Sequence, residues 1–326
     1  MRRGSYGYGS YRGRGGASTV LKVIIAVLAV ILVLAVAAFF YLQRYMVYSD
    51  DGTARLELPF LRREEPSPSL PPVVTGQPEP SSSPEPSPEP SPEPSARPER
   101  ILPVELPPEA LYDGTAAELV TEGGGTAALF DMKGDTGELA WVSGEPLAIA
   151  AKVSGGDPAV NVAAKAAAGE DGVYRIARVS CFKDNLLSNA DTSLAILTNS
   201  GYRWTDPEKV RWVSPTNPTV RSYLTGLCRE LAGLGFDEIL LDNAGYPTRG
   251  KLGYIKKGEA YDAEQFQSVI SGFYREVADA LEGTGVALSV VYDGESAALS
   301  GQSEKGIRAA GAAAVTRNAD GALTWP

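Results

Sequence analysis

Residues 101–326 predict an α/β domain built on a parallel sheet. Short, continuously apolar runs alternate along this part of the chain with longer stretches of helical periodicity. That order is typical of parallel strands covered by helices. Several of the apolar runs end on an aspartate. Sheets of this class are either (β/α) barrels or open doubly wound sheets, and both place their sites at the C-terminal ends of the strands.

Four apolar runs predict the central strands, because they are rich in the β-branched and aromatic residues that favour extended chain. The runs are TAALFDM at 126–132, VYRIARVSCF at 173–182, FDEILLD at 236–242 and VALSVVYD at 286–293. A weaker run, ILPVEL at 101–106, is a candidate first strand. Another, AAAVT at 312–316, is a candidate last strand.

Three helical stretches separate these strands. Residues 160–168 are rich in alanine. The second stretch begins with Asn217, a good N-cap, and has Pro218 in the first helical position. The third begins at Asp262 and carries apolar residues at intervals of three and four, which places them on one buried face. A further short helix is expected near residues 303–310.

Residues 23–42 form a candidate membrane span. They read VIIAVLAVILVLAVAAFFYL, carry no charge and are long enough to cross a bilayer core of about 30 Å. Only basic charges precede them in residues 1–22, so the positive-inside rule places this tail in the cytoplasm. A cleaved signal peptide is the alternative, but its apolar core normally has about 7–15 residues. We therefore expect an uncleaved single-pass anchor, and no nucleic-acid partner for the Gly/Tyr/Arg-rich tail.

Residues 43–100 predict an extracytoplasmic linker rich in proline, glutamate and serine. Proline has a restricted φ and no N–H, so it cannot support helix or sheet hydrogen bonding. The repeats within residues 66–98, such as PEPSPEPSPEP, favour extended polyproline II at about 3.1 Å per residue. Such a spacer suits a domain that stands off from the membrane within a cell wall.

The composition excludes several kinds of chemistry. The chain has no histidine, which rules out Ser-His-Asp and Cys-His mechanisms and histidine-based zinc sites. It has no phosphate-binding loop of the Walker type, and we expect no cofactor and no metal. Cys181 and Cys228 are expected to be buried thiols, although their spacing does not exclude a disulfide. Any catalysis must rest on carboxylates, lysine, arginine, tyrosine or serine.

Three motifs resemble a bacterial glycoside hydrolase family of TIM-barrel domains, distantly similar to the alpha-amylase clan. They are YRIARVSCFKDNLLSNA, WVSPTNPTVRSYL and GFDEILLDNAGYP, and the resemblance covers residues 126–292. It implies a (β/α)8 TIM-barrel-like domain, here with only five or six recognisable strands. The arginine that the family carries shortly after the aspartate is absent from DNAGYP, residues 242–247.

The resemblance implies a pair of carboxyl groups that cleave a glycosidic bond. Asp242 is the candidate nucleophile or stabilising carboxylate, and Asp293 or Glu295 is the candidate general acid. Arg178 lies inside an apolar strand and needs a partner, for which Asp131 or Asp242 is suitable. The candidate substrate-binding residues are Asp131, Lys133, Asp135, Arg178, Lys183, Asp184, Trp204, Asn243 and Tyr246.

The sequence thus predicts a membrane-anchored, extracytoplasmic glycoside hydrolase that acts on a polysaccharide or cell-wall glycan. A non-catalytic glycan-binding domain on a degenerate barrel is the main alternative. A structural protein of the wall or of division is a third, supported only by the anchor and the spacer. A second carboxyl group within about 10 Å of Asp242 would favour the enzyme, because a binding domain does not need it.

Overall fold

The computed structural model describes residues 46–48, 54–56, 95–155, 158–170 and 172–326. The chain divides into two compact units, residues 1–83 and 84–326. In the first unit, β1 (Met46–Tyr48) and β2 (Ala54–Leu56) form an antiparallel pair. The expected membrane span at 23–42 lies outside the described residues, as does most of the expected linker. Within the described ranges, no helix has the length and apolar character needed to cross a membrane.

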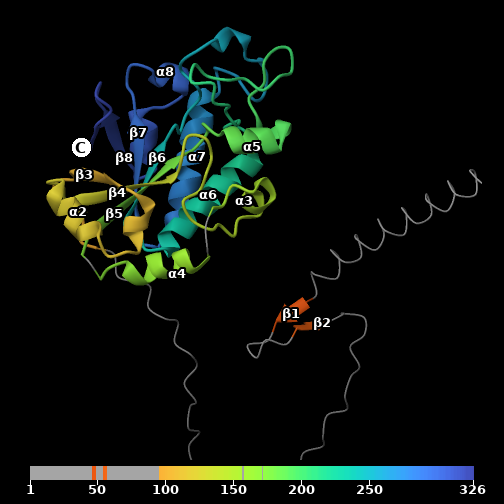
Figure 1. The fold of residues 1–326 in the computed structure, drawn as a ribbon. Helices are drawn as coiled ribbons and strands as arrows, with labels where there is room; N and C mark the ends of the chain where they lie inside the picture. The colour runs from red at the N-terminus through yellow and green to blue at the C-terminus, as the bar shows by residue number, and fades with distance from the viewer. Residues whose placement is uncertain (1–45, 49–53, 57–94, 156–157, 171) are drawn as a thin grey trace, which may run out of the picture. The chain divides into compact units, whose positions relative to one another are not determined.

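The second unit contains a mixed α/β sheet of seven strands that is nearly closed into a barrel (Figure 1). The strands are β3 (Pro103–Leu106), β4 (Ala127–Lys133), β5 (Tyr174–Ser180), β6 (Glu238–Asp242), β7 (Ala287–Tyr292), β8 (Ala313–Arg317) and β9 (Leu323–Thr324). They lie side by side in chain order. All neighbouring pairs from β3 to β8 are parallel, whereas β8 and β9 are antiparallel.

The expected TIM-barrel-like sheet with fewer than eight recognisable strands is confirmed in this coarser form. Six parallel strands are present among the described residues, and both weak candidates, at the first and last positions, belong to them. After β8 the chain turns at Asn318, whose side chain accepts hydrogen bonds from the N–H groups of Asp320 and Ala322. So tight a turn produces an antiparallel hairpin, since a parallel strand needs a crossover of about a dozen residues or more.

The helices fill the connections between the strands. The α-helices are α2 (Ala116–Glu122), α3 (Pro146–Ala151), α4 (Pro158–Ala167), α5 (Asn185–Ala190), α6 (Pro218–Gly233), α7 (Phe266–Leu281), α8 (Ala297–Ser300) and α9 (Glu304–Ala309). Three short 3₁₀ helices are η1 (Pro108–Leu111), η2 (Thr192–Leu194) and η3 (Leu252–Tyr254). The long helices α6 and α7 pack against each other on the outside of the sheet (Figure 1).

The two long helices start differently. The predicted cap of α6 is confirmed, because the Asn217 side chain accepts hydrogen bonds from the N–H groups of Thr219 and Val220. The predicted start of α7 at Asp262 is wrong by several residues, because α7 begins at Phe266. The segment before it is a turn, in which the N–H of Gln265 bonds the Asp262 carbonyl.

The barrel interior has an apolar middle. Along the strands, side chains point alternately outward, to the core between sheet and helices, and inward. The inward-pointing side chains form a small inner cluster, to which Trp325 near the C-terminus also belongs. Its buried members are Ile101, Ala127, Leu129, Tyr174, Ile176, Leu240, Val315 and Trp325. Burial of these side chains stabilises the closed shape at roughly 25 cal/mol per Å² of apolar surface.

The N-terminal end of the barrel is closed by a polar cluster around Glu238. This fully buried carboxylate accepts hydrogen bonds from the Tyr174 hydroxyl at 2.8 Å and the Trp325 indole N–H at 2.5 Å, and it pairs with Arg97 at 3.2 Å. Nearby, the Ser95 N–H donates to the Asp237 carboxylate. The start of the domain is therefore attached at this end, and the opposite end is left for a site.

Candidate functional site

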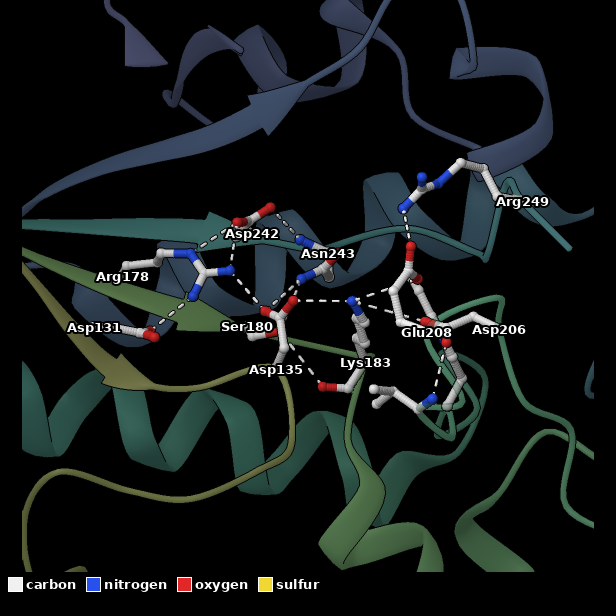
Figure 2. A network of polar contacts seen from close by, with 12 residues as sticks. Asp131, Asp135, Arg178, Ser180, Lys183, Asp206, Glu208, Asp242, Asn243 and Arg249 are labelled. Atoms are coloured by element: carbon white, nitrogen blue, oxygen red, sulfur yellow. Dashed lines mark hydrogen bonds and ion pairs between the residues drawn. The ribbon is translucent and has the colours of Figure 1, made fainter. Parts of the chain in front are cut away.

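Arg178 is the centre of the polar cluster at the C-terminal strand ends (Figure 2). It lies in β5 directly beside Asp131 of β4, and its Nη1 is 2.8 Å from Asp131 Oδ1. Its Nε donates to Asp242 Oδ2 at 2.8 Å, and its Nη2 donates to Asp135 Oδ1 at 2.7 Å. The expected ion pair of Arg178 with Asp131 or Asp242 is thus confirmed for both acids, and Asp135 is a third partner.

Asp242 is the last residue of β6 and is buried. Besides Arg178, its Oδ2 accepts a hydrogen bond from Arg317 at 2.5 Å, and its Oδ1 accepts one from the Asn243 N–H. A buried carboxylate is costly unless it is paired and hydrogen-bonded, and here two guanidinium groups provide that compensation. The charge of Asp242 is therefore held at a defined position at the mouth of the barrel.

Asn243 connects Asp242 to the neighbouring strand ends. Its backbone has φ 47°, in the left-handed region that asparagine tolerates better than most residues. Its side-chain amide donates to Asp135 Oδ1 at 3.0 Å and to the Ser180 hydroxyl at 2.9 Å. The break after β6 thus directs a second polar side chain into the cluster.

Asp135 lies in the turn after β4, between two cations. Its carboxylate contacts Arg178 and is 3.0 Å from Lys183 Nζ. Partial burial opposes ionisation, but the positive charges of Arg178 and Lys183 outweigh it and bring the pKa of Asp135 from 3.8 to about 2. Asp135 is therefore an anion at any pH at which the protein would work, and it cannot donate a proton.

Lys133 and Asp184 form a buried ion pair beneath the cluster. Lys133 Nζ lies 2.8 Å from Asp184 Oδ2 and donates to the Ser180 carbonyl at 2.7 Å, and both side chains are fully buried. Asp184 also caps α5 by accepting from the Leu187 N–H. Of the candidate residues Asp131, Lys133 and Asp135, only Asp135 lies in the turn after β4, because the strand continues to Lys133 with an irregular register after Asp131. Lys133 and Asp184 hold β4 to α5.

The two predicted acids after β7 are both exposed. Asp293 accepts hydrogen bonds from the Ser296 hydroxyl at 2.7 Å and the Glu295 N–H at 3.0 Å, and the Ser296 bond lowers its pKa. Asp293 lines a cavity of about 280 Å³ that Asp242 and Arg317 also line. Glu295 is not among the residues that line this cavity. The structure thus brings Asp293, rather than Glu295, to the space beside Asp242.

The predicted aromatic residues Trp204 and Tyr246 are buried in the loops. The Trp204 indole N–H donates to the Lys251 carbonyl at 3.2 Å. The Tyr246 ring stacks on Phe266 with the ring centroids 3.7 Å apart. Tyr261 meets the same ring edge to face, with the centroids 5.7 Å apart, so Tyr246 supports the loop after β6.

Sequence reasoning missed four residues of the cluster. Arg317 reaches Asp242 from the end of β8, 75 residues further along the chain. Ser180, Asp206 and Glu208 complete the network around Lys183, whose Nζ lies 3.7 Å from Asp206 and 3.9 Å from Glu208 (Figure 2). Arg178 was noticed because it is an arginine within an apolar strand. The same observation could have identified Arg317, which directly follows the apolar run at 312–316.

The cluster meets one geometric condition for glycoside hydrolysis. Asp131 and Asp135 share the Arg178 guanidinium with Asp242, so a second carboxyl group lies within the upper limit of about 10 Å for such pairs. A proton donor is less evident, because the pKa values of Asp135 and Asp293 are both lowered. No group of three or more potential ligand residues within the described ranges is arranged to hold a metal ion.

A protein-family model described as "Putative glycosyl hydrolase domain" matches residues 114–307. No curated protein matches the chain. Among solved structures, a hypothetical protein from Ruminiclostridium thermocellum is similar at 22% identity, with a TM-score of 0.48, over 57% of this chain and 96% of that one.

Two glycosidase structures are also similar. The alpha-L-fucosidase isoenzyme 2 from Paenibacillus thiaminolyticus is 15% identical, with a TM-score of 0.40 over 59% of this chain. An alpha-galactosidase from Thermus thermophilus is 11% identical, with a TM-score of 0.36 over 60% of this chain. This chain spans only 32% and 39% of the lengths of these two proteins, respectively.

Proposed function

The chain belongs to the glycosyl hydrolase domain family whose model matches residues 114–307, and we propose that it cleaves glycosidic bonds in a polysaccharide. The observation that supports this most is Asp242, a buried strand-end carboxylate that pairs with Arg178 and Arg317 and lines a cavity. In this position it serves as the nucleophile or as the charge that stabilises an oxocarbenium-like transition state.

Asp293 is the proposed general acid, because it lines the same cavity as Asp242. In the free protein its exposed carboxyl group is stabilised as an anion by Ser296. A bound sugar that displaces water from Asp293 would disfavour the anion and raise its pKa toward the working pH. Asp131 and Asp135 take the role of sugar-hydroxyl ligands at the other side of Arg178.

We also propose that the domain is displayed outside the cell by a single-pass anchor. The uncharged residues 23–42, the basic tail before them and the Pro/Glu/Ser-rich residues 43–100 support this placement. Ser95 and Arg97 attach the start of the domain at the end of the barrel opposite Asp242. The linker would therefore leave the cavity facing away from its point of attachment, toward a glycan of a Gram-positive-type wall.

A non-catalytic glycan-binding domain is the second candidate, and one observation favours it. Asp135 and Asp293, two acids close to Asp242, have lowered pKa values, and Asp131 is engaged by Arg178. A hydrolase needs one carboxyl group that is protonated near its working pH. A binding domain needs only the cavity and its hydrogen-bonding groups.

The experiment is reducing-sugar release from a panel of wall and plant polysaccharides by the full chain, purified in detergent. Pull-down by the same insoluble polysaccharides is measured in parallel. Hydrolysis that is lost in Asp242→Asn supports the enzyme. Binding without hydrolysis, by a protein with a cooperative unfolding transition, supports the second candidate. Neither binding nor hydrolysis on any glycan of the panel contradicts both.

A further inference from the structure

A second cavity lies beside the strand-end cluster, and neither the family match nor the proposed mechanism uses it. Its volume is about 730 Å³, within the range of about 300–1,000 Å³ that small-molecule sites occupy. Two segments form it, residues 198–209 and residues 250–254. They are joined by a β-bridge between Thr198 and Ile255, and the N–H of Lys256 donates to the Leu197 carbonyl.

The walls of this cavity are already ordered without a ligand. The segment around residues 195–213 folds back on itself through antiparallel bridges, and the Arg203 guanidinium donates to the carbonyls of Ser188 and Asn189 at the end of α5. Trp204 is buried against the second segment, where its indole N–H bonds the Lys251 carbonyl. Little order has to be created on binding, which favours affinity.

The cavity lining is positively charged, although the chain as a whole carries a formal charge of −10. Three of the lining residues, Arg203, Lys209 and Lys251, are cationic, and only Asp206 is anionic. The Asp206 carboxylate is already compensated, because it accepts from the Val210 N–H and the Trp212 indole N–H and lies 3.7 Å from Lys183 Nζ. The uncompensated charge that faces a ligand is therefore positive.

Lys209 occupies a backbone position that does not suit it. Its φ is 64°, in the left-handed region where a lysine is strained by about 1–3 kcal/mol and glycine is not. The exposed side chain has no ion-pair partner among the residues that the structure describes. The Lys209 ammonium group is therefore open to a ligand at the rim of the cavity.

Tyr254 supplies an open aromatic surface on the same cavity. Its side chain is 60% exposed, and Lys251 Nζ lies 5.6 Å from the centre of its ring. An exposed ring can stack on the apolar face of a sugar, while a lysine beside it pairs with a carboxylate on that sugar. One residue of the cavity lining also belongs to the strand-end network, because Asp206 lies 3.7 Å from Lys183 Nζ, which contacts Asp135 (Figure 2).

We propose that this cavity is a subsite for an acidic glycan, in which Tyr254 stacks on a sugar ring while Lys209 and Lys251 bind the carboxylate of a uronic acid. The proposal rests on the proposed glycan-directed function and names its substrate class, a carboxylated polysaccharide. It assigns to the glycan a second binding position, separate from the cavity beside Asp242.

The test compares two ligands that differ only in charge. The first is a hexasaccharide of α-1,4-linked galacturonic acid, and the second is the same hexasaccharide after reduction of its carboxyl groups to alcohols. Their dissociation constants for the full chain in detergent are measured by titration calorimetry. We expect the acid to bind at least about fivefold more tightly than the reduced form, and more weakly as salt is added.

Lys209→Gly removes the charge and relieves the backbone strain, so loss of folding is not a concern. It is expected to weaken binding of the acid about fivefold and to leave the reduced form unchanged. Lys152→Gly is the matched control, because Lys152 also has a left-handed backbone, with φ 55°, and is exposed, but does not line this cavity. It should change neither dissociation constant.

Tyr254→Ala is expected to weaken binding of both ligands about fivefold to tenfold, because stacking does not depend on the carboxylate. Tyr202→Ala is its control. Tyr202 lies on the other segment that forms the cavity and is 76% exposed, but is not part of the cavity lining. Its replacement should have no effect on either ligand.

Equal affinity for the acid and its reduced form, equal effects of Lys209→Gly and Lys152→Gly, or no binding of either ligand would each overturn the subsite. These results do not decide whether the protein is a hydrolase, which is tested separately. If reducing sugar is still released from other glycans and lost in Asp242→Asn, the subsite alone fails. If the acid binds as expected but no variant and no glycan gives hydrolysis, the catalytic proposal alone fails.

Discussion

Replacement of Arg178 by methionine tests how the candidate site is held together. Methionine is similar in length but carries no charge, so the change removes the ion pairs and leaves most of the packing. Three carboxylates would lose their shared partner: Asp131, Asp135 and Asp242. Asp242 would keep Arg317, at 2.5 Å. Asp135 would keep Lys183, at 3.0 Å. The protein is expected to fold less stably at neutral pH, because three carboxylates then lie close together with less positive charge between them.

The size of this loss follows from the exposure of the three acids. Removal of one partner of a buried ion pair costs about 3–5 kcal/mol. The side chains of Asp131 and Asp135 are 42% and 36% exposed, so water compensates part of their charge. The Asp242 side chain is only 4% exposed and depends on Arg317 alone after the change. We therefore expect the free energy of unfolding to fall by about 2–3 kcal/mol.

Urea unfolding followed by tryptophan fluorescence measures this loss. The four tryptophans are Trp141, Trp204, Trp212 and Trp325, so the signal reports on the second unit. The urea midpoint is expected to fall by about 1 M. Arg221→Met is the matched control. The side chains of Arg178 and Arg221 are both 15% exposed, but Arg221 pairs with only one, half-exposed carboxylate, Glu276, so its loss should stay below about 1 kcal/mol.

The pH dependence gives a second readout. Arg178 helps to bring the pKa of Asp135 to about 2, so the stability that Asp135 contributes is present above its ordinary value of 3.8 and is lost as pH falls toward 2. In Arg178→Met the same protonation relieves repulsion. The difference between the two proteins should therefore shrink between about pH 4 and pH 2. An Arg178→Met protein as stable as the Arg221→Met control, or a difference that does not change with pH, would refute the reasoning.

Three further predictions follow from other parts of the structure. Asp135→Asn should remove about 1 kcal/mol of stability at pH 6, after a discount for exposure, and almost none at pH 2; urea midpoints at the two pH values measure this. Trp325→Ala should lower the free energy of unfolding by about 3 kcal/mol, because it removes an indole from the inner cluster and a hydrogen bond from buried Glu238. Unfolding followed by circular dichroism measures this, and a loss below about 1 kcal/mol would mean that the C-terminus does not close the barrel. Cys181 and Cys228 are free and buried, so neither should react with a thiol reagent until the chain unfolds, when two thiols per chain should appear; a protein that shows none in urea would contain the disulfide instead.

Much of the sheet could be predicted from local sequence. The apolar runs of β4, β5, β6 and β7 are continuous because both faces of these strands are buried, and Asn217 with Pro218 marks the start of α6. The free, buried state of Cys181 and Cys228 was also expected and is confirmed. These features depend on side chains that act on their own segment of chain.

The parts that could not be predicted depend on contacts between distant segments. Arg317 lies next to Asp242 only because β8 completes the parallel part of the sheet. Trp325 contacts Glu238 because the chain turns back after β8 and pairs antiparallel with it. The two residues of β9 are too short a segment to predict this turn from the sequence. Lys133 was a candidate substrate-binding residue because it follows an apolar run, but it is buried against Asp184, a partner outside the strand.

The most direct test of the account is the initial rate of reducing-sugar release by Asp242→Asn relative to the unchanged protein, on the glycan that the protein hydrolyses best. Both proteins must be shown to be folded at the assay temperature by their urea midpoints, because Asp242 also pairs with Arg178 and Arg317. The rate in the variant is expected to be at least about 100-fold lower. A rate within a factor of two of the unchanged protein would contradict it, since the carboxylate on which the proposed function depends would then have no part in the reaction.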